Sequence, residues 1–292
     1  MALQYIADNL WLALAVTALF SLLVGSFLNV VIHRLPIMME REWQLMAVEA
    51  SNPEDPQIPE QLQQPYNLAI PVSRCPHCDH KIQWYENIPV ISYLFLKGQC
   101  SECNASISLR YPLIELITAL ISVLIVYLYG FNLIALAAIM FSWCLLCLTV
   151  IDLDHQLLPD KITLPLLWLG LIINSFGIFT SLPMALWGAV LGYLSLWSVY
   201  WIFKLITGKE GMGYGDFKLL SALGAWAGAD SLPLIILFSS VIGATIGGLM
   251  IALRNHESQT PIPFGPYLAG AGWIALLWGD EITQLYLGFI GL

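Results

Sequence analysis

The sequence LIALAAIMFSWCLLCLTVIDLDHQLLPD, residues 133–160, combines the two features that decide the fold. Residues 133–151 carry no charge, whereas three aspartates stand among the nine residues that follow. A run of about 20 apolar residues is long enough to cross the roughly 30 Å hydrocarbon layer of a bilayer as a helix. Ionisable side chains at the edge of such a run are costly to bury and are therefore candidates for a functional site. The stretch predicts a membrane helix that ends in a cluster of carboxylates.

The composition of the whole chain resembles that of this stretch. Of 292 residues, 58% are hydrophobic and only 11% are charged, whereas a soluble domain is roughly 25% charged. These values exclude a soluble globular protein, a disordered chain and a fibrous repeat. Further apolar runs cover residues 10–32, 112–129, 162–179, 184–203, 217–229, 232–253 and 267–285. We therefore expect an all-α polytopic membrane protein with about eight transmembrane helices, although the short run 217–229 leaves open whether that segment crosses fully.

The few positive charges predict the orientation of these helices. If every run crosses the bilayer, all 11 Lys and Arg residues fall on one side: Arg34, Arg41, Arg74, Lys81, Lys97, Arg110, Lys161, Lys204, Lys209, Lys218 and Arg254. The positive-inside rule assigns that side to the cytoplasm, so both termini are expected outside. The first run has no cation before it, unlike a cleaved signal peptide. No basic stripe is available to neutralise phosphates, so we expect no nucleic-acid partner.

Residues 33–110, between the first two runs, differ from the rest of the chain. They hold six of the 11 Lys and Arg residues, nine of the 20 Asp and Glu residues, and a Pro- and Gln-rich segment at 51–65. We expect a small cytoplasmic insert here. The chain then divides into a first transmembrane helix (1–32), the insert (33–110) and a seven-helix membrane domain that carries the carboxylates (111–292).

The second half of the insert contains two C-x2-C pairs separated by 21 residues: Cys75 with Cys78, and Cys100 with Cys103. This spacing is close to that of a four-cysteine zinc site. A reducing cytosol disfavours disulfides, and an insert too small for a large core benefits from a metal that links its parts. Four sulfur ligands leave no open position for water, so the zinc would be structural. His77 and His80 remain alternative ligands.

Three residues within apolar runs are left without an assigned role. Cys144 and Cys147 lack charged neighbours and are best interpreted as small buried hydrophobic residues. Glu115 is best interpreted as an acid at the membrane interface, although a role in a site stays open.

Two aspartates on different predicted helices are the candidates for catalysis. Asp152 follows the apolar run 133–151, and Asp216 precedes the run 217–229. If both stand at the cytoplasmic edge, their carboxyls can face each other. Two close carboxyls do not both ionise readily, so one can act as a base toward water while the other acts as an acid. This is the arrangement of an aspartic protease. Gly213 and Gly215 permit an unwound backbone beside Asp216, where an extended substrate could lie.

Alternatives exist at both aspartates. Asp154 lies about 200° round the helix from Asp152, so the two cannot share a face, and it remains a second candidate. Asp160 follows a proline and is expected to cap the next helix. Asp216 could simply pair with Lys218. A phosphate-binding loop is disfavoured, because no strand precedes the glycines and no G-K-[ST] follows them.

The chain resembles the type IV prepilin leader peptidases, a family of G-x-G-D aspartic membrane proteases. The matching segments are GSFLNVVIHRLP (25–36), CPHC with CSEC, RYPLIELITA (110–119), IDLDHQLLPD (151–160), GMGYGDFKLL (211–220) and PIPFGPYLA (261–269). Together they run through nearly the whole chain, and residues 40–64 hold no recognisable motif.

The resemblance implies both an activity and residues. The first Asp of I-D-x-D and the Asp of G-x-G-D are the catalytic pair in this family, here Asp152 and Asp216. Such enzymes of the bacterial inner membrane remove the leader of type IV prepilins and type II secretion pseudopilins at the cytoplasmic face, and so support pilus biogenesis and secretion. Members with the cysteine-bearing insert also methylate the new N-terminal residue, commonly Phe, with S-adenosylmethionine. No residue of this sequence is assigned to that methyl donor, and no oligomeric state is predicted.

Two other classes of function compete with this interpretation. A polytopic transporter could use the carboxylates as a proton relay, but transporters usually have broken helices in both halves, and only one glycine-rich break is visible here. A non-catalytic assembly scaffold would need neither aspartate.

Overall fold

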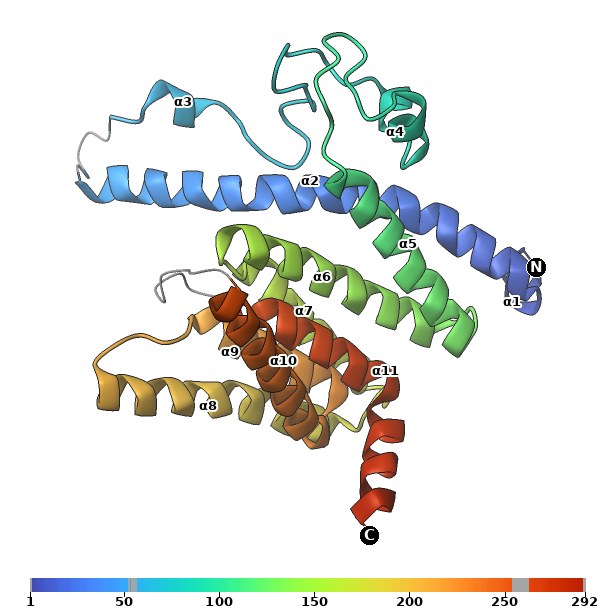
Figure 1. The fold of residues 1–292 in the computed structure, drawn as a ribbon, viewed down its shortest axis with the longest axis vertical. Helices are drawn as coiled ribbons and strands as arrows, with labels where there is room; N and C mark the ends of the chain where they lie inside the picture. Colours follow the sequence, from blue (N-terminus) through green and yellow to red (C-terminus); the bar gives the residue numbers. More distant parts are fainter. Residues whose placement is uncertain (1, 52, 54–56, 254–262, 291–292) are drawn as a thin grey trace. The chain divides into compact units, whose positions relative to one another are not determined.

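The computed structural model describes residues 2–51, 53, 57–253 and 263–290 (Figure 1). Every named element in these ranges is a helix, so the predicted all-α fold is confirmed. The chain forms two compact units, Met1–Trp143 and Cys144–Leu292, which are described in turn. Arg254, parts of the Pro-rich segment and the start of PIPFGPYLA lie outside the described residues.

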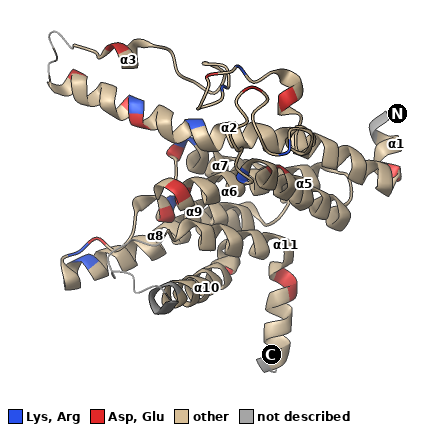
Figure 2. Cartoon of the chain, turned by 45° about the horizontal axis from the view of Figure 1, so that its top comes forward, with Lys and Arg blue, Asp and Glu red and all other residues tan. Residues whose placement is uncertain are grey.

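Among the described residues, five helices are long and apolar enough to cross a membrane: Leu10–Ser51, Arg110–Tyr129, Leu133–His155, Leu182–Thr207 and Ala229–Leu249. They support a polytopic membrane protein, but the expected total of eight spans is not confirmed. The helices α7 (Asp160–Asn174) and α9 (Tyr214–Ala227) have only 15 and 14 residues, and α11 (Gly265–Ile290) is interrupted at Trp278. Figure 2 shows that α8 and α10 are free of charge over most of their length.

In the first unit, the short helix α1 (Ala2–Asp8) precedes α2 (Leu10–Ser51), which packs along α5 (Arg110–Tyr129). A Cβ added at Gly25 would lie 2.7 Å from the Cα of Glu115. Glycine at this position therefore lets the two helix backbones approach closely. The helix α6 (Leu133–His155) begins in this unit and ends in the second.

The helix α2 is much longer than the predicted first run. It does not stop at Ile32 but continues through Pro36 to Ser51, so the first part of the insert is helical. The residues after Pro36, IMMEREWQLMAVEAS, are mostly good helix formers. Charge and hydropathy mark where the apolar stretch ends, and they carry no information on where the helix ends.

Where the structure describes it, the rest of the insert contains three short helices, α3 (Glu60–Gln63), η1 (Trp84–Asn87) and α4 (Ile91–Phe95). Two buried charged residues join it to the long helices. Arg34 of α2 donates hydrogen bonds to the carbonyl oxygens of Asn67 and Pro71, at 3.0 and 2.6 Å. Glu115 of α5 accepts the backbone N–H of Val90 at 2.8 Å. The contact with Val90 gives Glu115 a structural role, which the sequence alone had left open.

The second unit contains the end of α6 together with α7, α8 (Leu182–Thr207), α9, η2 (Ala229–Ser231), α10 (Leu232–Leu253) and α11. The short helix α9 packs against α7, α8 and α11, and its side chains Phe217, Leu219 and Leu220 are fully buried. It is thus the central helix of this unit, which explains why a segment of only 14 residues is so apolar.

Two glycines on α8 allow it to touch α9. A Cβ on Gly188 would lie 2.1 Å from the carbonyl oxygen of Gly224, and one on Gly192 would lie 2.6 Å from that of Leu220. Glycines four residues apart are a common means of bringing membrane helices into backbone contact. This contact fixes the position of α9, the helix that carries Asp216.

Candidate functional site

Asp152 lies in the last turn of α6 and is 5% exposed. Asp154, two residues later on the same helix, is exposed, as the helical periodicity requires. The Oδ2 atom of Asp152 accepts the backbone N–H of Gly265, the first residue of α11, at 3.0 Å. A Cβ at Gly265 would lie 2.6 Å from the same oxygen, so only glycine permits this contact.

Asp216 lies in the first turn of α9 and is 8% exposed. It is close enough to Asp152 for the charge of one carboxyl to act on the other. The buried side chain of Leu158 lies beside both, because Cβ atoms at Gly215 and Gly265 would come within 2.8 and 3.1 Å of it. The two aspartates are therefore brought together in the same unit. Asp216 stands at the N-terminus of α9, and Asp152, at the end of α6, meets the first N–H of α11; backbone N–H groups at a helix N-terminus favour negative charge.

The two glycines before Asp216 are under different constraints: one position could accept another residue, and the other has no room for a side chain. Gly213 is the N-cap of α9 with φ −82° and ψ 151°, an extended conformation that other residues also adopt. At Gly215 the requirement is space, because any Cβ would overlap Leu158. Support of a substrate backbone by either glycine stays a prediction.

Lys218 forms an ion pair with an aspartate other than Asp216. Its Nζ lies 2.7 Å from both carboxylate oxygens of Asp160, the first residue of α7. The alternative pairing of Lys218 with Asp216 is thus not observed. The expected capping role of Asp160 is also wrong, because Pro159 is the N-cap and makes no side-chain capping bond. The carboxylate of Asp160 instead joins the start of α7 to the first turn of α9.

The loop between α8 and α9 is held by several contacts. Gly208 ends α8 in the left-handed conformation, with φ 70°. Lys204 donates hydrogen bonds to Glu210 at 2.8 Å and to the hydroxyl of Tyr200 at 3.2 Å. The hydrogen bond and the positive charge of Lys204 lower the pKa of Glu210. The loop that leads to Asp216 is therefore joined to α8 through Glu210.

The four cysteines of the insert form one cluster in which all Sγ atoms lie within 4.8 Å of one another. The contacts Cys75–Cys103 and Cys78–Cys100 measure 3.8 and 4.0 Å. Tetrahedral zinc with Zn–S bonds of about 2.3 Å requires sulfur separations of about 3.8 Å. The predicted set of four ligands is confirmed as a group that can hold a metal ion. His80 instead contacts Glu86 at 3.0 Å.

Both halves of this cluster have the same backbone pattern. In the first half, the Cys75 N–H donates to the His80 carbonyl and the Asp79 N–H donates to the Cys75 carbonyl. The second half repeats this pattern: Cys100 donates to Ala105, and Asn104 donates to Cys100. The residue after each second cysteine has a positive φ. Backbone N–H groups of His77 and Cys78 lower the pKa of Cys75 to about 7, which favours the thiolate that a metal needs.

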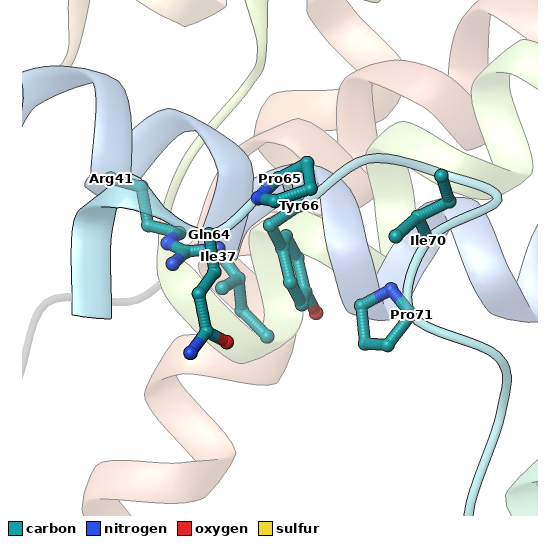
Figure 3. Close-up of a pocket in the computed structure, with 7 residues that line it drawn as sticks. All are labelled: Ile37, Arg41, Gln64, Pro65, Tyr66, Ile70 and Pro71. Carbon is teal, nitrogen blue, oxygen red and sulfur yellow. The ribbon is translucent and has the colours of Figure 1, made fainter. Parts of the chain in front are cut away.

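A cavity of about 580 Å³ lies in the insert, and Figure 3 shows the residues that line it. It is lined by Ile37, Arg41, Gln64, Pro65, Tyr66, Ile70 and Pro71. The guanidinium of Arg41 stands 5.0 Å from the centre of the Tyr66 ring. A pocket of this size can hold a small organic molecule. No motif indicates it, because its walls come from separate, motif-free segments.

Sequence comparisons match both halves of the chain to known families. The Bacterial Peptidase A24 N-terminal domain matches residues 19–129, and the Type IV leader peptidase family matches residues 139–248. The chain is 60% identical over 289 residues to the "Prepilin leader peptidase/N-methyltransferase" of Pseudomonas aeruginosa, covering 99% of this chain and 98% of that protein. It is 59% identical to the protein of the same name from Stutzerimonas stutzeri, over 99% of both chains.

A third relative of that name, from Dichelobacter nodosus, is 56% identical over 92% of both chains. No solved structure matches the chain. The named relatives do not support the transporter alternative.

Proposed function

The chain belongs to the type IV leader peptidase family, and on this basis we propose that it removes the leader of type IV prepilins and pseudopilins and then N-methylates the new N-terminal residue. The observation that carries the peptidase assignment is the pair of buried aspartates, Asp152 and Asp216, on two different helices. The names of its relatives support both activities.

The aspartate pair is suited to hydrolysis by general acid–base catalysis. Of two neighbouring carboxyls, one remains ionised and takes a proton from water, while the other is protonated and donates to the oxygen of the scissile carbonyl. Gly265 donates its N–H to Asp152, and Asp216 lies at the N-terminus of α9. Backbone donors at both positions lower the free-energy cost of burying the negative charge that the two carboxyls share.

We further propose how the chain lies in the membrane. The cationic residues assign the insert, and the ends of α6 and α9 that carry the aspartates, to the cytoplasmic side of the inner membrane. The termini are then periplasmic. A prepilin leader, which is made in the cytoplasm, would reach the site without crossing the bilayer. The insert (33–110) is proposed as a cytoplasmic module and residues 111–292 as the membrane domain with the peptidase site.

We propose that the cysteine cluster holds a structural Zn²⁺. The support is the donor set, since four thiolates at these separations match tetrahedral zinc. S-adenosylmethionine would supply the methyl group for the second activity. The cysteine-bearing insert is the part of the chain to which we assign methyl transfer.

Single substitutions of the two aspartates test the peptidase assignment. Asp152→Asn and Asp216→Asn should each slow leader cleavage by about a hundredfold to ten-thousandfold, because each removes one proton-transferring group. Cleavage is measured by mass spectrometry of a prepilin incubated with the purified enzyme. Methylation of an already cleaved pilin by the same preparations reports whether the variants are folded.

Asp154→Asn is the matched control. Its carboxyl is exposed and lies on a different face of α6, so cleavage should remain near that of the unmodified enzyme. Full cleavage by either the Asp152 or the Asp216 variant, or a loss confined to the Asp154 variant, would contradict the assignment.

A further inference from the structure

A second cavity, of about 430 Å³, lies in the insert next to the cysteine cluster. It is formed by η1, α4 and the two cysteine-bearing turns. Its walls are His80, Tyr85, Glu86, Ile88, Ile91, Ser92, Phe95, Leu96, Ser101 and Glu102. Its volume falls in the range of small-ligand sites, and its walls combine apolar and acidic side chains.

The apolar wall comes mainly from α4 and the residues before it. Phe95 is 82% exposed and Ile91 is 50% exposed, although both are large hydrophobic side chains. Leaving such side chains uncovered costs free energy in water, since apolar burial is favourable. An apolar group bound in the cavity would cover them.

The polar wall carries more negative than positive charge. Glu86 is only 9% exposed in its side chain and accepts hydrogen bonds from the Gln83 N–H at 2.8 Å and from the hydroxyl of Ser101. His80 contacts Glu86 at 3.0 Å and Glu102 at 4.0 Å. Even a protonated His80 balances only one of the two carboxylates. Glu102, which lines the cavity and is 66% exposed in its side chain, therefore keeps an uncompensated charge.

We propose that this cavity binds the acceptor of methyl transfer, with the N-terminal ammonium of the cleaved pilin beside Glu102 and its apolar first side chain against Ile91 and Phe95. The inference rests on the proposed function and adds a location to it. A free amino acid fits less well, because none of the lining residues is a lysine or arginine that would pair with its carboxylate.

The chemistry of the step agrees with this placement. The ammonium loses one proton to water, and the nitrogen lone pair then attacks the methyl carbon of the sulfonium donor. A C–N bond forms as the C–S bond breaks, and the sulfur keeps the bonding electrons as a neutral thioether. The cavity has to bind and orient the amine, and a carboxylate next to an apolar wall provides both functions.

The test uses the full-length enzyme and a synthetic peptide that begins with Phe, so that methylation is measured without prior cleavage. Glu102→Gln and Phe95→Ala should each raise the KM for this peptide by about tenfold, since each removes one of its binding contacts. The KM for S-adenosylmethionine should stay unchanged. An N-acetylated peptide, which lacks the ammonium, should not compete with the free peptide.

Two substitutions serve as matched controls. Leu94→Ala changes another exposed apolar residue of α4 that does not line the cavity, and Glu60→Gln removes an acid elsewhere in the insert. Both should leave the peptide KM as it is. Leader cleavage and bound zinc are measured on every preparation to report folding.

Each outcome decides the inference. If Glu102→Gln leaves the peptide KM unchanged, raises the KM for the methyl donor instead, or lowers leader cleavage equally, the cavity is not the acceptor site. If Leu94→Ala behaves like Phe95→Ala, the effect is not specific to the cavity. If the unmodified enzyme fails to methylate the peptide at all, the proposed methyl transfer itself is wrong, and not only its location, which is a distinguishable result.

Discussion

The cysteine cluster and the aspartate pair are assembled in different ways. The four cysteines come from two short turns with identical backbone hydrogen bonds, so most of their geometry is local. The two aspartates come from α6 and α9, and the N–H beside Asp152 comes from α11. With the proposed zinc, the first site depends mainly on a bound ion, whereas the second depends on the packing of several helices.

This difference predicts that the two sites fail separately. Damage to the metal ligands should leave the helices of the second unit packed, and damage to helix packing should leave the cysteine turns able to bind metal. Three changes test this separation, in order of decreasing expected effect.

Loss of one cysteine should have the largest effect. Cys75→Ser should lower bound zinc at least about tenfold, because structural zinc contributes on the order of 10 kcal/mol to small metal domains and needs all four ligands. Metal analysis of the purified protein under reducing conditions measures this, and leader cleavage should persist. Cys144→Ser, which changes a cysteine outside the cluster, is the control. Full zinc content in the Cys75 variant would refute the metal site.

Adding a methyl group between α8 and α9 should do the reverse: leader cleavage should fall while bound zinc stays unchanged. In Gly188→Ala the new methyl group would lie 2.1 Å from the carbonyl oxygen of Gly224, so the helices must separate. Overpacking of this kind costs about 1–3 kcal/mol, and displacement of α9 should reduce leader cleavage strongly. Thermal unfolding and zinc content are measured together. Gly279→Ala, where a Cβ meets nothing within 4 Å, should be neutral. An equally stable Gly188→Ala enzyme would show that α8 and α9 do not need this contact.

The ion pair between Lys218 and Asp160 should have the smallest effect on stability. Its side chains are 28% and 51% exposed, and partly exposed pairs contribute about 0–1 kcal/mol. Lys218→Ala should nevertheless slow cleavage by up to about tenfold, because the pair positions the turn that carries Asp216. The exchanged pair, Asp160→Lys with Lys218→Asp, should recover part of the rate. No recovery would indicate that the charges act separately.

The sequence predicted features that depend on composition and local spacing. The run 232–253 coincides with α10, and two C-x2-C pairs were enough to predict the metal cluster. Helical periodicity separated Asp152 from Asp154 correctly, because α6 continues past both. In each case the deciding information lies within a few turns of chain.

Apart from the approach of Asp152 and Asp216, features that depend on distant partners were not predicted. Nothing in the local sequence indicates that Gly265 donates to Asp152, or that Asp160 meets Lys218 rather than capping a helix. The glycine spacing at 188 and 192 is a signal in the sequence for close helix packing, but it does not say which helix is the partner. The extent of α2 was missed because helix formation continues after hydrophobicity ends.

The repeated backbone pattern of the cysteine turns has a consequence for cells short of metal. Each turn supplies two of the four sulfur ligands, so neither turn completes the metal site alone. When one turn opens and the ion is lost, the other turn also loses the metal that stabilises it. Under zinc limitation we expect two populations of molecules, fully loaded and fully open, rather than one population that is uniformly weakened. Pilin methylation would then rise and fall with the loaded fraction, and the ratio of methylated to unmethylated pilins on a cell would record its zinc supply.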